Sequence, residues 1–220
     1  MKNLFLKGIN KVNKHKLLEA GEPYWIYDYD VAQKLDDQGE KLKALVVDLN
    51  LIQLRIKSLQ GSELKEQART YACAIRKINP ECAIIMNDHI ELALELQLDG
   101  VHLGQSDDSV IKARETLGAE SIIGLTVRSL EEADEAEKLY KDELIDYIGS
   151  GTVFETTTKQ GLVAKGPGFI QEVQKRIPTE RIYPIGGITA GNIDQLKAID
   201  VKHVALCSEL FRNSVNELTI

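Results

Sequence analysis

Short apolar runs of strand length alternate along the chain with amphipathic stretches that have the period of a helix. One amphipathic stretch covers residues 64–78. A second opens with Ser129 and Glu132 at the spacing of a capping box, and a third, 191–199, has Asn192 as a candidate cap. The predicted strands are residues 24–29, 51–57, 82–88, 100–105, 121–127, 146–154, 181–188 and 202–210. Strands that alternate with helices in this way indicate a parallel sheet.

The number of apolar runs decides how such a sheet is arranged. Eight parallel strands close a (β/α)8 barrel, and the 220 residues of the chain fall within the usual size of that fold. We therefore predict an α/β protein with a single (β/α)8 TIM-barrel domain over residues 1–220, in which residues 1–23 form a short N-terminal helical extension. An open, doubly wound sheet is the alternative arrangement.

Composition and charge limit the classes of partner that the protein can have. Apolar residues make up 43% of the chain, and 34 acidic against 27 basic residues give a formal charge of −7. An acidic protein repels phosphate backbones, which argues against nucleic acid as a partner. No apolar run is long enough to cross a membrane, and the basic start of the chain lacks the apolar core of a signal peptide. We expect a cytoplasmic protein with no membrane partner; its oligomeric state stays open, a homo-oligomer included.

Functional groups of a TIM barrel lie at the carboxyl ends of its strands. Gln53, Arg55 and Lys57, in the second predicted strand, alternate and therefore point to the same side. Cationic side chains directed into a barrel interior are unfavourable unless an anion binds there. The alternative is a basic face exposed to water on an edge strand, but a closed barrel has no edge.

Two acidic residues follow neighbouring strands. Asn87 and Asp88 end the third apolar run, and Asp107 follows the fourth. Carboxylates beside cationic groups suit a Mg²⁺ ion that is shared with phosphate oxygens. The alternative is that each aspartate caps the helix that follows it.

The last three strand ends carry groups that bind phosphate. Residues 156–159 combine three threonines with a lysine, and the seventh run ends in Gly186 and Gly187. Cys207 and Ser208 end the eighth run, and the loops after strands seven and eight form the common phosphate site of TIM barrels. A solvated turn is the alternative for 156–159. No nucleophile triad or P-loop is present, so the pattern predicts metal-assisted departure of a diphosphate beside a second phosphorylated ligand.

These segments resemble the thiamine-phosphate synthase family from about Tyr24 to Phe211. The matching motifs are QLRIK (53–57), MND (86–88), DGVHLGQSD (99–107), IIGLTV (122–127), GTVFETTTK (151–159), IGGI (185–188) and LCSELF (206–211). The resemblance implies a (β/α)8 enzyme that joins a hydroxymethylpyrimidine diphosphate to a thiazole phosphate, with thiamine phosphate and diphosphate as products. Its partners would be small phosphorylated substrates and its cofactor Mg²⁺.

The resemblance also implies roles for individual residues. Arg55, Lys57 and Lys159 would stabilise the departing diphosphate. The pyrimidine diphosphate would be bound by Gln53, Arg55, Lys57, Asn87, Lys159 and Thr126, which stands where the family usually has serine. The metal ligands would be Asp88 and Asp107. The thiazole phosphate would be bound by Thr156, Thr158, Gly186, Gly187, Cys207 and Ser208.

Three residues depart from the family pattern. Arg128 replaces a histidine, and Thr152 and Glu155 replace prolines. The departures leave three other functions open: a thiazole tautomerase, which resembles this fold but relies on that histidine, a non-catalytic binding barrel of the thiamine pathway, and another phosphate-binding barrel enzyme. Release of diphosphate from the two substrates separates them.

Overall fold

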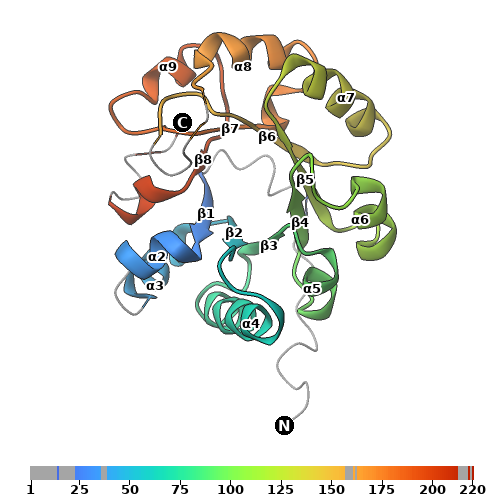
Figure 1. Ribbon diagram of the computed structural model, residues 1–220. Coiled ribbons are helices and arrows are strands. Elements are labelled where there is room, and N and C mark those ends of the chain that lie inside the picture. Colours follow the sequence, from blue (N-terminus) through green and yellow to red (C-terminus); the bar gives the residue numbers. More distant parts are fainter. Residues whose placement is uncertain are drawn as a thin grey trace.

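Eight parallel strands close into a barrel in chain order, which confirms the predicted TIM-barrel fold and excludes the open sheet. The computed structural model describes residues 14, 23–35, 39–156, 161, 163–212, 218 and 220. The barrel closes where β1 pairs with both β2 and β8 (Figure 1). The strands are β1 (Tyr24–Asp28), β2 (Leu51–Arg55), β3 (Ala83–Asn87), β4 (Gly100–Leu103), β5 (Ile122–Val127), β6 (Tyr147–Gly151), β7 (Ile182–Ile185) and β8 (Ala205–Leu206).

Helices surround the ring of strands (Figure 1). The α-helices are α2 (Tyr29–Leu35), α3 (Glu40–Leu45), α4 (Gly61–Ile78), α5 (Ile90–Glu95), α6 (Val110–Leu117), α7 (Leu130–Lys141), α8 (Gly166–Gln174) and α9 (Asp194–Lys197). The 3₁₀ helices are η2 (Val46–Asp48), η3 (Thr179–Arg181) and η4 (Ser208–Phe211). None of the helices in the described ranges is long and apolar enough to cross a membrane.

Some predicted boundaries are confirmed and others are wrong. Ser129 caps α7, because its hydroxyl accepts a hydrogen bond from the amide of Glu132 at 3.1 Å. The helix predicted over 191–199 shrinks to α9, and Asn192 does not cap it. Instead the Asn192 side chain bonds back to the loop after β7, accepting from the amide of Thr189 at 2.8 Å. The run 202–210 contributes only the two residues of β8, and nearly all of the predicted extension 1–23 lies outside the described residues.

Apolar side chains form two layers of core. The larger layer lies between the strands and the helices, and it includes Ile52 and Leu54. The smaller layer fills the barrel interior and consists of Tyr24, Ile26, Leu51, Ala83, Ile85, Ile122, Tyr147, Tyr183 and Ala205. Along β2 the two layers alternate, so Gln53 and Arg55 face the interior as the sequence pattern predicts.

The amino-terminal end of the barrel is held by an ion-pair unit that occurs twice. Arg76 of α4 pairs with Asp99, directly before β4, and the same carboxylate accepts a backbone N–H of β3 at 2.7 Å. Arg114 of α6 pairs with Asp146, directly before β6, at 2.7 Å, and that carboxylate accepts a backbone N–H of β5 at 2.8 Å. Each unit ties a helix to two neighbouring strands.

Candidate active site

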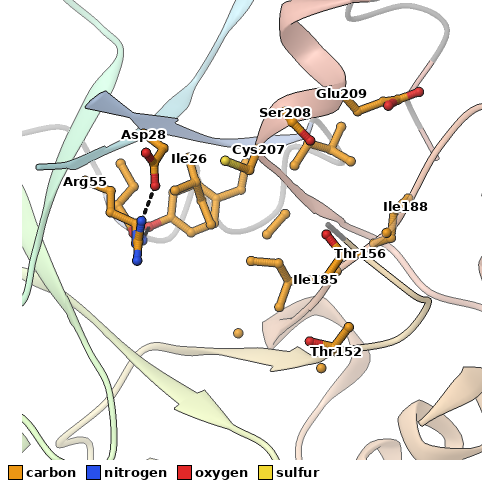
Figure 2. Close-up of a pocket in the computed structure, with 18 of the residues that line it drawn as sticks. Ile26, Asp28, Arg55, Thr152, Thr156, Ile185, Ile188, Cys207, Ser208 and Glu209 are labelled. Atoms are coloured by element: carbon orange, nitrogen blue, oxygen red, sulfur yellow. Dashed lines mark hydrogen bonds and ion pairs between the residues drawn. The ribbon is translucent and has the colours of Figure 1, made fainter. Parts of the chain in front are cut away.

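A cavity of about 530 Å³ opens at the carboxyl ends of the strands. It is the position at which TIM barrels carry their functional groups. Figure 2 shows Arg55 on one side of the cavity and Thr156 and Ser208 on the other. The predicted site residues that line it are Gln53, Arg55, Asn87, Thr126, Thr156, Gly186, Gly187, Cys207 and Ser208. The structure thus brings together residues from β2, β3 and β5 and from the loops after β6, β7 and β8.

Arg55 is paired with a buried carboxylate of the cavity lining. Its guanidinium forms an ion pair with Asp28, the last residue of β1 (Figure 2). The other oxygen of Asp28 accepts the backbone N–H of Val31 at 3.1 Å, so the start of α2 holds this carboxylate in place. Sequence reasoning missed Asp28, although its position at the end of the first apolar run was a usable signal. The pair explains how a buried strand end carries an arginine before any anion arrives.

Lys57, Asp88 and Asp107 form a charged cluster beside the cavity. Lys57 forms an ion pair with Asp88, and the Asp88 and Asp107 carboxyl groups hydrogen-bond to each other. Partial burial and the neighbouring Asp107 raise the pKa of Asp88 against the opposing effect of Lys57. Burial acts in the same sense at Asp107, but hydrogen bonds from the Gly104 amide and from Asp88 outweigh it and lower the pKa of Asp107.

This cluster fits the predicted magnesium site better than a pair of helix caps. Helix α5 begins after His89 without a side-chain cap, and α6 is capped by Ser109, whose hydroxyl accepts the amide of Lys112 at 3.1 Å. Two adjacent carboxylates match the one or two that Mg²⁺ takes from a protein when phosphates and waters complete its shell. No group of three or more metal-ligating His, Cys, Asp or Glu side chains occurs among the described residues, which makes this site unlike a closed metal cage.

The loops after β6 and β7 pack closely against each other. A Cβ atom at Gly187 would lie 2.2 Å from the carbonyl oxygen of Glu155, and φ at this glycine is 63°. Packing between the loops therefore requires glycine here. Thr156 lines the cavity next to this contact. The predicted ligand-binding residues Thr158 and Lys159 lie outside the described residues.

Sequence reasoning also missed Thr189, Glu209 and Arg212 in the cavity lining, and two polar residues of the barrel strands, Tyr24 and His102. Both lie on strands and point into the barrel, Tyr24 from β1 and His102 from β4. The sequence signal was weak, because a lone tyrosine or histidine within an apolar run is ordinary in a core.

A protein-family model described as "Thiamine monophosphate synthase" matches residues 27–210 of the chain. The chain belongs to the thiamine monophosphate synthase family. It is 36% identical over 169 residues to a thiamine-phosphate synthase of Halalkalibacterium halodurans, an alignment that covers 76% of this chain and 77% of that protein. It is 31% identical over 205 residues to the thiamine-phosphate synthase of Clostridioides difficile, covering 91% and 92% of the two chains.

One solved structure supports the same family, and a second shows the same fold. The structure of a thiamine phosphate pyrophosphorylase from Pyrococcus furiosus superposes with a TM-score of 0.73 at 27% identity, and covers 92% of this chain and 95% of that one. A 3-hexulose-6-phosphate synthase from Salmonella typhimurium has a TM-score of 0.61 at 15% identity, which is a likeness of fold alone.

The three departures from the family pattern all line the cavity of this thiamine monophosphate synthase family member. Thr152 is buried, and its methyl group occupies the space that a side chain at Gly186 would need. Arg128 and Glu155 are exposed at the cavity. Their charges therefore lie at the cavity but in contact with water, where charge interactions are weakened by screening.

Proposed function

We propose that this chain catalyses the Mg²⁺-dependent condensation of 4-amino-5-hydroxymethyl-2-methylpyrimidine diphosphate with 4-methyl-5-(2-phosphoethyl)thiazole, which yields thiamine phosphate and diphosphate. One observation carries the proposal: a single cavity joins the basic end of β2, with the acidic pair beside it, to the turn at Gly186 and Gly187. An enzyme that joins two phosphorylated substrates needs two anion sites at one reaction centre.

The departing diphosphate is the group that the protein must stabilise. The bond between the pyrimidine methylene carbon and the diphosphate oxygen breaks, and its electron pair leaves with the diphosphate. Arg55 and Lys57, with Lys159, would donate charge-assisted hydrogen bonds to the oxygens on which negative charge accumulates. Mg²⁺ held by Asp88 and Asp107 would supply further positive charge to the same oxygens.

The second substrate completes the reaction without a protein nucleophile. The thiazole nitrogen donates its lone pair to the methylene carbon, so a C–N bond replaces the broken C–O bond and no proton is transferred. The protein's part is to hold the thiazole phosphate, through Thr156, the glycine turn and Ser208, with its nitrogen facing that carbon.

The ion pairs at the cavity must rearrange when ligands bind. If Asp88 holds a metal ion, Lys57 would lose its carboxylate partner, and its ammonium group would be available to the diphosphate. Arg55 can keep one contact with Asp28 and use its remaining N–H groups for phosphate oxygens, because a guanidinium offers five donors in a fixed geometry.

Partners and location follow from the same proposal. Its partners are two small phosphorylated molecules. We further propose that the protein works in the cytoplasm. We do not expect nucleic acid as a partner, since a formal charge of −7 disfavours binding to phosphate backbones in general.

Incubation of the purified protein with both substrates and Mg²⁺ tests the proposal. We expect thiamine phosphate and diphosphate in equal amounts, measured by mass spectrometry and a diphosphate assay, and no product when Mg²⁺ is removed by chelation. Binding of both substrates without product would indicate a non-catalytic binding barrel. Isomerisation of a thiazole carboxylate phosphate would indicate a tautomerase, which we do not expect because position 128 holds an arginine in place of the histidine on which that activity relies.

A further inference from the structure

Five polar side chains form one line of hydrogen bonds across the floor of the cavity; we call them the polar relay. Gln53 Nε2 donates to Tyr24 Oη at 2.6 Å, and Tyr24 Oη lies 2.7 Å from Tyr147 Oη. Tyr147 Oη lies 3.1 Å from His102 Nδ1, and His102 Nε2 lies 2.9 Å from Thr126 Oγ1. The two ends of the relay, Gln53 and Thr126, line the cavity, whereas Tyr147 lies beneath its lining.

The barrel has space for the relay because two strand positions are glycine. A Cβ atom at Gly124 would lie 2.2 Å from the Tyr147 ring and 2.5 Å from His102 Nδ1. A Cβ atom at Gly149 would lie 3.2 Å from His102 Cε1. Tyr147 is fully buried, and so the link between Tyr24 and His102 is shielded from water. Inside a barrel core such a hydrogen-bonded chain is stronger than in water, and each unmade bond is unfavourable.

The hydrogen atoms of the relay can be placed one after another. The Gln53 amide nitrogen only donates, so Tyr24 Oη accepts from it. The Tyr24 hydrogen then points at Tyr147, the other hydrogen-bond partner that the described residues offer this hydroxyl. Burial raises the pKa of both tyrosines, so both phenols keep their hydrogen at neutral pH.

The second half of the relay follows from the first. Since Tyr147 accepts from Tyr24, its own hydrogen points at His102 Nδ1, which must therefore be the unprotonated nitrogen. His102 then carries its hydrogen on Nε2 and donates it to Thr126 Oγ1. The Thr126 hydroxyl hydrogen is left to point into the cavity.

We propose that Tyr147 and His102 are positioning residues that set the hydrogen-bonding character of the two ends of the relay, so that Gln53 offers its carbonyl oxygen and Thr126 offers its hydroxyl hydrogen to the ligand. A ligand that matches them carries an N–H donor and a separate acceptor, as an aminopyrimidine with a diphosphate does. The identity of this ligand rests on the proposed function, whereas the direction of the relay does not.

The tautomer of His102 tests the direction of the relay without any substrate. We would label the histidines with ¹⁵N, record two-bond ¹H–¹⁵N correlations at neutral pH, and assign His102, one of four histidines, by the loss of its signals in His102→Asn. We expect the neutral tautomer with the hydrogen on Nε2. A hydrogen on Nδ1, or on both nitrogens, would overturn the proposal. Because no substrate is present, this result is independent of whether the protein is a synthase.

Kinetics of Tyr147→Phe test whether the relay acts on the ligand. Tyr183→Phe is the matched control, because Tyr183 packs edge-on against Tyr147 with ring centroids 5.2 Å apart but makes none of the relay's hydrogen bonds. We expect Tyr147→Phe to raise KM for the pyrimidine diphosphate about tenfold, to leave KM for the thiazole phosphate unchanged, and to give His102 a mixture of tautomers. Equal effects of the two variants on this KM would contradict a positioning role.

Discussion

The two ends of the barrel use the same kinds of charged residue in different surroundings. At the amino-terminal end, Arg114 and Asp146 are 13% and 10% exposed, and the carboxylate also binds a backbone amide of β5. At the carboxyl end, Arg55 and Asp28 are 20% and 4% exposed, and both line a cavity. The carboxylate of the first pair already binds Lys14, Arg114 and a backbone amide, whereas the second pair lines a cavity.

The position of an ion pair in the barrel thus determines whether it can stabilise the fold or take part in ligand binding. A pair that joins a helix to two strands and is closed off from a ligand contributes to stability. We expect a pair beside a cavity to exchange partners when ligands bind. Substitutions at the carboxyl end should therefore change activity or ligand binding, and substitutions at the amino-terminal end should change the free energy of unfolding.

The largest effect on activity is expected at the acidic pair of the carboxyl end. Asp88→Asn and Asp107→Asn should each lower kcat by at least about 10²-fold, because each would weaken binding of the Mg²⁺ ion that we propose stabilises the leaving diphosphate. The midpoint of urea unfolding should change little in either variant, because asparagine keeps a hydrogen-bonding side chain and Lys57, the ion-pair partner of Asp88, is 46% exposed to water. Near-normal rates in both variants at saturating Mg²⁺ would remove the metal assignment.

The matching substitution at the amino-terminal end should lower stability and not activity. Asp146→Asn leaves Arg114 without its partner and also breaks a 3.1 Å ion pair with Lys14. We expect the free energy of unfolding to fall by about 3 kcal/mol, measured by urea denaturation. Below the unfolding transition kcat should change less than about twofold, the range expected away from the reacting groups. A large fall in kcat with unchanged stability would contradict the division between the two ends.

A moderate effect is expected from Asp28→Asn. The variant keeps an oxygen for the amide of Val31 but removes the negative charge beside Arg55. Inorganic diphosphate should then bind about five- to tenfold more tightly, because one carboxylate no longer opposes it. Calorimetric titration measures this change, and Asp99→Asn at the other end is the control, for which we expect no change in affinity.

The smallest effect is expected at Glu155, which is exposed beside the predicted thiazole phosphate site. Glu155→Pro should lower KM for the thiazole phosphate about threefold, because it removes a like charge and restricts the loop before binding. Glu155→Gln removes the charge alone and so separates the two causes. If neither variant tightens binding, water screens the Glu155 carboxylate and this departure from the family pattern has no effect on the substrate.

Much of the fold was predictable because the spacing of apolar residues along the chain indicates which segments form strands and helices. Alternation in β2 predicted that Gln53 and Arg55 face the interior, and the count of apolar runs predicted the closed barrel. The helix predicted over 191–199 is shorter in the structure, where it forms α9, because Asn192 bonds to the preceding turn and does not cap the helix. Such a local competition between two bonding patterns leaves no mark in the hydrophobic pattern.

The candidate site was predictable in part, for a related reason. Residues that end a predicted strand could be assigned to one face of the barrel, and Asn87 and Ser208, assigned in this way, do line the cavity. Thr126 also lines it, but it was named from the family resemblance. Contacts between distant strands could not be predicted: Tyr24 and Tyr147 are 123 positions apart, and their contact depends on how the strands are staggered around the barrel. The pairing of Arg55 with Asp28 depends on the same stagger.

The central claim is that ion pairs at the carboxyl end of the barrel exchange partners when ligands bind, whereas those at the amino-terminal end do not. Calorimetric titration with diphosphate tests this claim most directly. The protein would be titrated with diphosphate in the presence and absence of Mg²⁺, as wild type, Asp107→Asn and Asp146→Asn. We predict Mg²⁺-dependent binding by the wild type and by Asp146→Asn, and loss of that dependence in Asp107→Asn. Equal binding with and without Mg²⁺ in the wild type, or unchanged Mg²⁺-dependent binding in Asp107→Asn, would contradict it.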